Sequence, residues 1–191
     1  INNSFSNQDY LPYSIGLLQG FIQKNLNNND CFEFLLPIYK RIPVGDAVNR
    51  LIGAHIILFS VYVWNFRISL EIARQIKANN KEVVVVFGGP QIPYRQAEAF
   101  LRLNPFIDIA CHGEGELIIQ SIVENYPLRN WKEAHSASYI NEDGKYVETI
   151  AHGRISDLNM IPSPYNEGVF DLLVEANPNT EWIALWETNR G

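Results

Sequence analysis

The sequence predicts a doubly wound α/β fold built on a parallel sheet with helices on both faces. The run at 83–87, four valines and a phenylalanine, has no polar interruption, which is typical of a central strand buried on both faces. A second apolar run at 56–59 precedes it, and segments with helical periodicity follow both runs. Alternating strands and helices with short connections form parallel sheets with right-handed crossovers.

Before the 83–87 run, apolar periodicity and capping residues predict further elements in alternation. Pro12 suits the first turn of a helix, where its missing N–H costs nothing. Asp46 and Asn65 are N-cap residue types, and Gly53 is a typical helix stop. The expected elements are a helix at about 12–26, a strand at 32–38, a short helix from Asp46 to Gly53, the strand at 56–59 and a helix after Asn65.

After the central run, the pattern continues and then changes near residue 126. We expect a helix at about 93–103, a strand at 107–111 and a helix opened by residues 113–116. Two short strands at 137–140 and 146–149 flank an Asp-Gly turn and predict a hairpin. A proline-rich linker at 155–171 and a strand-like segment at 182–186 follow.

The expected strand order is flavodoxin-like (Rossmann-like), 2-1-3-4-5, with the first strand mostly upstream of Ile1. Open α/β sheets bind ligands in a crevice at the carboxyl ends of their strands. Gly88 and Gly89 let the backbone approach a ligand closely, and Pro90 stiffens the exit from the strand. The loops expected to line the crevice are 2–11, 60–65, 88–91 and 112–116.

Composition excludes several classes of protein. The net charge of −6 and the lack of a Lys/Arg cluster argue against a nucleic-acid partner. Cys31 and Cys111 have no companion spacing, so neither a disulfide framework nor a zinc site is expected, which fits a reduced, cytoplasmic compartment. No apolar run is long enough for a membrane span. Because the chain begins at Ile1, we expect it to be a piece of a longer protein.

Three motifs occur here in one order: the Gly-Gly-Pro loop at 88–90, the run IDIACHGEGE at 107–116 and the linker ISDLNMIPSP at 155–164. Together they resemble the N-terminal cobalamin (B12)-binding domain of cobalamin-dependent radical S-adenosylmethionine (SAM) enzymes. In that family the linker precedes a barrel whose first strand leads into a C-x-x-x-C-x-x-C iron–sulfur loop. The segment 187–191 resembles the residues directly before that loop, and the cysteines themselves are absent from this sequence.

The resemblance implies a division of the chain and a set of cofactor-binding residues. It implies a Rossmann-like cobalamin-binding domain at 1–128, a hairpin and linker at 129–180, and the truncated start of a radical SAM barrel at 181–191. Ser60, Gly88 and Gly89 would line the path of the nucleotide tail, and residues 62–65 would face the corrin ring. The full implied set is Ser60, Tyr62, Val63, Trp64, Asn65, Gly88, Gly89, Pro90, Gln91, His112, Gly113, Glu114 and Gly115.

One departure from the family's pattern affects the expected state of the cofactor. Many cobalamin domains carry D-x-H-x-x-G after the first strand, and the histidine binds cobalt; this sequence has no such motif. The resemblance therefore implies base-off cobalamin without a protein histidine ligand. The parent protein would be a methyltransferase that also uses a [4Fe-4S] cluster and SAM. This chain, which lacks the cluster loop, would bind cobalamin but perform no chemistry alone.

Each motif also has a purely structural interpretation, and a second function stays open. Gly-Gly-Pro after a buried strand can be a plain tight turn, and residues 113–116 can be a helix start with favourable acidic residues. His112 at a strand end can be structural, and Trp64 can shield a cofactor or pack in a core. The alternative is a flavodoxin-like domain that binds a nucleotide or a partner protein.

Overall fold

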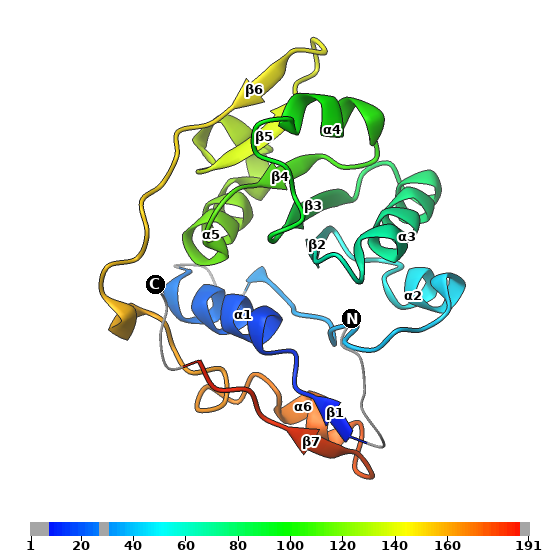
Figure 1. The fold of residues 1–191 in the computed structure, drawn as a ribbon, viewed down its shortest axis with the longest axis vertical. Coiled ribbons are helices and arrows are strands. Elements are labelled where there is room, and N and C mark those ends of the chain that lie inside the picture. The colour runs from blue at the N-terminus through cyan, green and yellow to red at the C-terminus, as the bar shows by residue number, and fades with distance from the viewer. Residues whose placement is uncertain (1–7, 27–30, 188–191) are drawn as a thin grey trace. The chain divides into compact units, whose positions relative to one another are not determined.

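The computed structural model describes residues 8–26 and 31–187 of the 191-residue chain. The chain divides into two compact units, one formed by residues 42–156 and the other by residues 1–41 together with 157–191. Figure 1 shows the ribbon coloured along the chain. Each unit is described separately below.

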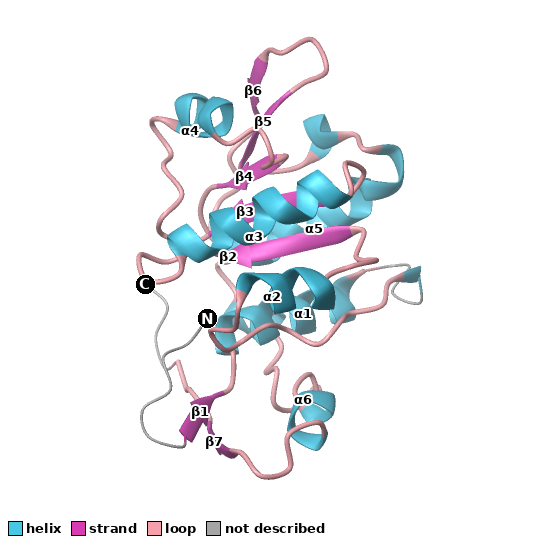
Figure 2. Cartoon of the chain, turned by 90° about the vertical axis from the view of Figure 1, so that its right-hand side faces the viewer, coloured by secondary structure: helices cyan, strands magenta, loops and turns pink. Residues whose placement is uncertain are grey.

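A five-stranded sheet in the order β2-β3-β4-β5-β6 forms the centre of the 42–156 unit (Figure 2). β2 (Ile56–Ser60), β3 (Val84–Gly88) and β4 (Ile109–Cys111) are parallel to one another. β5 (Ala137–Ile140) and β6 (Tyr146–Glu148) continue the sheet in antiparallel pairing. The strands predicted at 56–59, 83–87 and 107–111 are therefore confirmed as consecutive parallel neighbours.

Helices connect these strands and cover the sheet on both sides. They are α2 (Val44–Arg50), α3 (Phe66–Asn79), α4 (Ala97–Leu103) and α5 (Gly115–Asn125). α3 and α5 lie on opposite sides of the strands in Figure 1. This doubly covered, mostly parallel sheet confirms the α/β fold class. Because residues 84–87 of β3 are almost completely buried, their uninterrupted apolar sequence has its physical cause in the two helical layers.

An ion pair holds the beginning of β4 against β3. The Lys77 ammonium at the end of α3 lies 2.7 Å from the Asp108 carboxylate, and the same carboxylate accepts a hydrogen bond from Val85 N at 2.7 Å. A carboxylate that accepts several hydrogen bonds fixes the segments that donate them. The aspartate of the 107–116 motif thus has a structural role between the strands.

The hairpin of β5 and β6 belongs to the same compact unit as the central strands. β5 pairs with β4 through Ala110 and Ser138, and the turn between β5 and β6 contains Gly144 with φ of +74°. The predicted hairpin is therefore confirmed. The boundaries predicted at 128 and 180 divide the chain differently from the compact units, and as a division by function they stay a prediction.

The second unit contains α1 (Tyr13–Asn25), α6 (Asp171–Glu175) and a parallel pair of strands, β1 (Gln8–Tyr10) and β7 (Glu181–Ile183). Its core is made of Leu11, Tyr39, Phe170 and Leu173. Residues 155–170 of the predicted linker are irregular apart from a 3-10 helix at Leu158–Met160, and Asp171 begins α6. No helix within residues 8–26 and 31–187 has the length and apolar character needed to cross a bilayer.

The strand predicted at 32–38 is wrong. These residues have no regular secondary structure and no sheet ladder, and the side chains of Leu35 and Leu36 are exposed. Branched and aromatic residues form a strand only when a neighbour supplies hydrogen-bond partners, and Pro37 has no N–H to donate. The predicted first strand upstream of Ile1 lies outside the described residues.

Candidate functional site

The loops after β2, β3 and β4 meet at one edge of the sheet because parallel strands end on the same side. Val61 N, just after β2, donates to Gly88 O at 2.7 Å, and Gln91 N donates to Val61 O at 3.3 Å. A Cβ placed on Gly88 would lie 3.6 Å from Cys111 Cβ at the end of β4. The structure therefore brings together the predicted loops 60–65, 88–91 and 112–116.

Gly89 is required by the protein's own backbone. Its φ is +103°, and a Cβ at this position would lie 2.6 Å from Val61 O. Gly88, by contrast, has room for a methyl group. The Gly88-Gly89 pair thus forms a tight turn against the end of β2, and its use as a path for a ligand tail stays a prediction. Pro90 and Gln91 follow at the surface.

Asn65 closes the loop between β2 and α3 with its side chain. Its Oδ1 accepts from Tyr62 N at 2.8 Å, and its Nδ2 donates to Ser60 O at 2.9 Å. The residue is 3% exposed and is the N-cap of α3, but its side chain makes no cap hydrogen bond. The expectation that the Asn65 side chain caps the helix is therefore wrong, because this amide is used to shape the loop.

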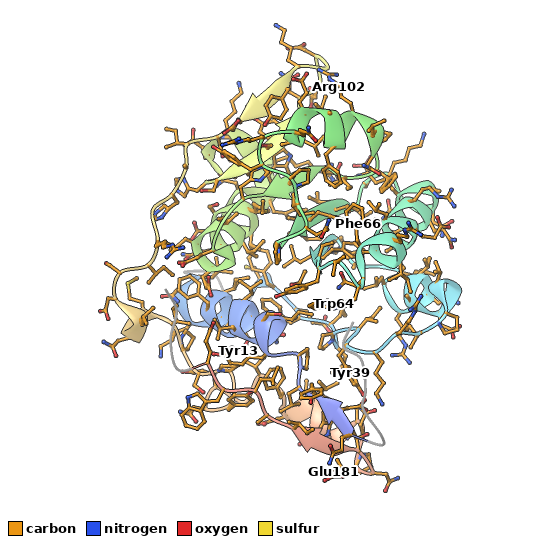
Figure 3. All side chains as sticks on the ribbon, in the orientation of Figure 1. Tyr13, Tyr39, Trp64, Phe66, Arg102 and Glu181 are labelled. Atoms are coloured by element: carbon orange, nitrogen blue, oxygen red, sulfur yellow. The ribbon has the colours of Figure 1, made fainter. Side chains whose placement is uncertain are left out.

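Tyr62, Val63 and Trp64, in the loop that the Asn65 side chain closes, form an exposed apolar surface. We call this surface the aromatic platform. The Tyr62 and Trp64 rings stack with centroids 4.7 Å apart and an interplanar angle of 7°. Val63 is 74% exposed and Trp64 is 56% exposed, so neither is a core residue. Trp64 and Phe66 project in different directions from the start of α3 (Figure 3). A flat apolar surface of this kind is typical of a binding site.

A cavity of about 240 Å³ adjoins the start of α5. It is lined by Gly113, Glu114, Leu117, Ile118, Ser136 and the segment 152–155. Gly113 has φ of +106°, and no neighbouring atom lies within 4 Å of the point that a Cβ would occupy, so its missing side chain leaves open space. Gly115 is the first residue of α5. This cavity lies where the sequence predicts ligand contacts from residues 113–115.

The Glu114 carboxylate ties the cavity's outer segment to α5. Its Oε2 accepts from Ile155 N at 3.3 Å, and its Oε1 lies 3.8 Å from Arg154 Nε. The carboxylate thus already has partners in the chain, and it remains half-buried at the rim. Its predicted contact with a ligand stays a prediction.

His112, at the end of β4, belongs to a hydrogen-bond network that the sequence did not predict. Its Nε2 lies 2.9 Å from Ser138 Oγ, and its ring meets the edge of Tyr94 at a centroid distance of 5.0 Å. Burial lowers the pKa of His112, and the nearby Glu148 carboxylate opposes this shift. Tyr146 and Glu148 are two residues apart in a strand and so lie on the same face of β6. This spacing is the sequence feature that indicates part of the network.

The remaining predictions concern the loop at 2–11 and metal ligands. Residues 2–7 lie outside the described part, and Asp9 belongs to the other compact unit, where it pairs with Lys40. Within residues 8–26 and 31–187, no group of His, Cys, Asp and Glu side chains could hold a metal ion.

Comparisons with known proteins agree with this arrangement. Residues 44–123, which include all three loops at the sheet edge, match the model of the B12 binding domain family. The chain is 29% identical over 188 residues to the cobalamin-dependent radical SAM methyltransferase TokK of Streptomyces tokunonensis. It is 29% identical over 197 residues to 2-(S-pantetheinyl)-carbapenam-3-carboxylate methyltransferase of Streptantibioticus cattleyicolor. Each match covers 95% of this chain and 27% of the relative.

The fold is also similar to that of a solved structure, the cobalamin-dependent SAM radical enzyme OxsB with aqua-cobalamin bound. The TM-score is 0.68 at 18% sequence identity, and the match covers 93% of this chain and 24% of OxsB. With aqua-cobalamin and SAM bound, OxsB gives a TM-score of 0.67 at 19% identity, covering 88% of this chain and 23% of that one. The chain thus spans about a quarter of the length of these proteins. It is similar over 95% of its length to a cobalamin-dependent radical SAM methyltransferase, and its residues 44–123 match the B12 binding domain family.

Proposed function

We propose that this chain binds cobalamin at the carboxyl edge of β2, β3 and β4. The observation that carries the proposal is the combination, at one edge, of the aromatic platform with the cavity at Gly113. A corrin ring needs an exposed apolar surface, and a nucleotide tail needs a passage with few side chains. The aromatic platform supports the first requirement, and the open space at Gly113 supports the second.

The residues at this edge have distinct proposed roles. The aromatic platform would face the corrin ring and exclude water from its lower side. Ser60 and Gly88 would border the nucleotide tail, with Gly89 keeping the turn tight against Val61. Residues 113–115 would meet corrin amides or the nucleotide loop. Bound cobalamin supplies a cobalt centre that can carry a methyl group.

We further propose that cobalamin is bound base-off and without a protein histidine ligand. The sequence lacks the D-x-H-x-x-G motif that supplies this ligand in other cobalamin domains. The lower side of cobalt would then be left to water, to no ligand or to a residue of the 62–65 loop.

The parent protein is proposed to be a radical SAM methyltransferase. This rests on the 29% identity to two methyltransferases, of which the chain covers only 27%. A barrel of the same parent chain would hold the [4Fe-4S] cluster and SAM. The present chain would then bind cobalamin and perform no methyl transfer alone.

Gel filtration after incubation with hydroxocobalamin tests the proposal. The protein peak should carry the red cofactor, whereas a flavodoxin-like nucleotide or partner domain should elute colourless. Gly113→Leu should strongly reduce retention because it fills the cavity. Gly53→Leu is a matched control, since Gly53 also has positive φ and open space around its Cβ position but lies before β2. A colourless wild-type peak, or equal retention by both variants, would refute the proposed site.

A further inference from the structure

A chain of hydrogen bonds runs from His112 across the sheet to the surface. His112 Nε2 lies 2.9 Å from Ser138 Oγ on β5, and Ser138 Oγ lies 2.9 Å from the Tyr146 hydroxyl on β6. The Tyr146 hydroxyl donates to Glu148 Oε2 at 3.3 Å. The Tyr94 hydroxyl donates to the other carboxylate oxygen at 2.8 Å. Five side chains from four segments are therefore joined in one network.

The direction of each hydrogen bond follows from counting protons. A carboxylate only accepts, so Tyr146 and Tyr94 both use their single hydroxyl proton on Glu148. Tyr146 can then only accept from Ser138, which uses the one proton of its own hydroxyl. In this assignment Ser138 Oγ accepts from His112, and His112 Nε2 carries a proton.

The buried position of Ser138 limits its hydroxyl to these two partners. Ser138 is completely buried, so water cannot replace either partner of its hydroxyl. Among the described residues, the His112 ring makes no further hydrogen bond, and its Nδ1 has no partner in the network. Burial lowers the pKa of His112, which favours the neutral ring at pH 7. In a neutral ring with Nε2 protonated, Nδ1 is an acceptor.

We propose that this network holds His112 as the neutral Nε2–H tautomer and so presents Nδ1 as a hydrogen-bond acceptor for an N–H or O–H group of the ligand at the sheet edge. His112 follows β4 directly and precedes Gly113 at the cavity. The ligand's identity rests on the proposed function: cobalamin carries primary amides around the corrin ring and a hydroxyl on its ribose. His112 would select for such donor groups, and Ser138, Tyr146 and Glu148 would be positioning residues.

Long-range ¹H–¹⁵N correlation spectra of the ¹⁵N-labelled chain at pH 7.5 report the tautomer of each histidine directly. His112, assigned by the loss of its signals in His112→Gln, should show a protonated Nε2 and an unprotonated Nδ1. A protonated Nδ1 in the wild-type chain would overturn the inference. This readout requires no cofactor, so it can fail while cobalamin retention succeeds, and the reverse is equally possible.

Two tyrosine-to-phenylalanine variants test whether the network determines the tautomer of His112. In Tyr146→Phe, Ser138 loses its acceptor and can donate to His112 Nε2, so the population should shift toward the Nδ1–H tautomer. Tyr126→Phe removes the same hydroxyl outside the network, in the 3-10 helix Tyr126–Leu128, and should leave the spectrum of His112 unchanged. An unchanged tautomer in Tyr146→Phe would contradict the proposed role of the network.

Titration with hydroxocobalamin, whose Co(III) is diamagnetic, tests the contact between His112 Nδ1 and the ligand. On saturation, the Nδ1 signal should move upfield as it accepts a hydrogen bond, while Nε2 stays protonated. His112→Asn keeps an acceptor oxygen near the Nδ1 position and should bind with near wild-type affinity. His112→Gln keeps the contact toward Ser138 instead and should bind roughly 3- to 10-fold more weakly, the usual effect of one lost hydrogen bond. Tight binding without movement of Nδ1, or equal affinity of both variants, would reject the ligand contact.

Discussion

Gly89 and Val61 meet backbone to backbone at the sheet edge, where a Cβ on Gly89 would lie 2.6 Å from Val61 O. The contact joins the loops after β2 and β3, and the hydrogen bond from Gln91 N to Val61 O reinforces it. The turn that orders the predicted binding edge therefore depends on a position without a side chain.

Gly89→Ala should lower the free energy of unfolding by about 1–3 kcal/mol, because the methyl group meets backbone and the residue has positive φ. Gly88→Ala is the matched control and should change stability little, since its methyl group would lie 3.6 Å from Cys111 Cβ. Urea unfolding followed by circular dichroism measures both. Equal stability of the two variants would show that the turn tolerates a side chain at 89.

Trp64→Ala should reduce affinity for hydroxocobalamin roughly tenfold or more, because it removes a large apolar surface from the aromatic platform. Its effect on unfolding should stay within about 0.5 kcal/mol, since the side chain is 56% exposed. Leu128→Ala, at an exposed apolar position in another part of the unit, should affect neither quantity. Absorbance titration gives the affinities, and unchanged binding by Trp64→Ala would remove the platform from the site.

Gly16→Ala should destabilise the second unit by about 1–3 kcal/mol, because a Cβ at Gly16 would overlap the buried ring of Phe170. Gly20→Ala lies one helical turn further along α1, where the nearest atom is 3.4 Å from the Cβ position, and should be tolerated. Thermal unfolding distinguishes the two variants. A Gly16→Ala protein as stable as Gly20→Ala would mean that Phe170 packs elsewhere in solution.

Cys31 should react with a thiol reagent at pH 8 in the folded chain, while Cys111 should react only after unfolding. Cys31 is exposed, and burial raises the pKa of the Cys111 thiol to about 12. Because the folded state holds this proton more tightly than the unfolded state, the thiol's contribution to stability is complete below about pH 9 and is lost as pH rises toward about 12. Cys111→Ala should reduce this loss at high pH. Rapid labelling of both cysteines in the native protein would contradict the buried position.

The sequence was sufficient where a local pattern determines the structure. The uninterrupted apolar run at 83–87 identified the central strand because strands covered on both faces are this apolar, and the run at 56–59 identified its parallel neighbour. Residues 32–38 have strand-like composition but no neighbouring ladder, which depends on tertiary structure. The meeting of the loops at 60–65, 88–91 and 112–116 was predicted correctly because parallel strands end together, whereas most of the fourth predicted loop, 2–11, lies outside the described residues.

What the sequence could not supply were contacts between residues far apart in the chain. Ser138, Tyr146 and Glu148 join His112 only because β5 and β6 extend the sheet beyond β4. The requirement for glycine at position 89 could not be predicted either, because it depends on the path of the backbone at Val61. Asn65 was recognised as a capping residue, whereas its side chain bonds to the loop before it.

Electron paramagnetic resonance of Co(II) cobalamin mixed with the ¹⁵N-labelled chain tests the central claim most directly. Free Co(II) cobalamin at neutral pH shows nitrogen splitting from its own tail base, so binding in the base-off state without a histidine ligand should abolish this splitting. Persistence of the free-cofactor spectrum would show that the chain does not bind cobalamin base-off, and a ¹⁵N doublet would show that a protein nitrogen binds cobalt.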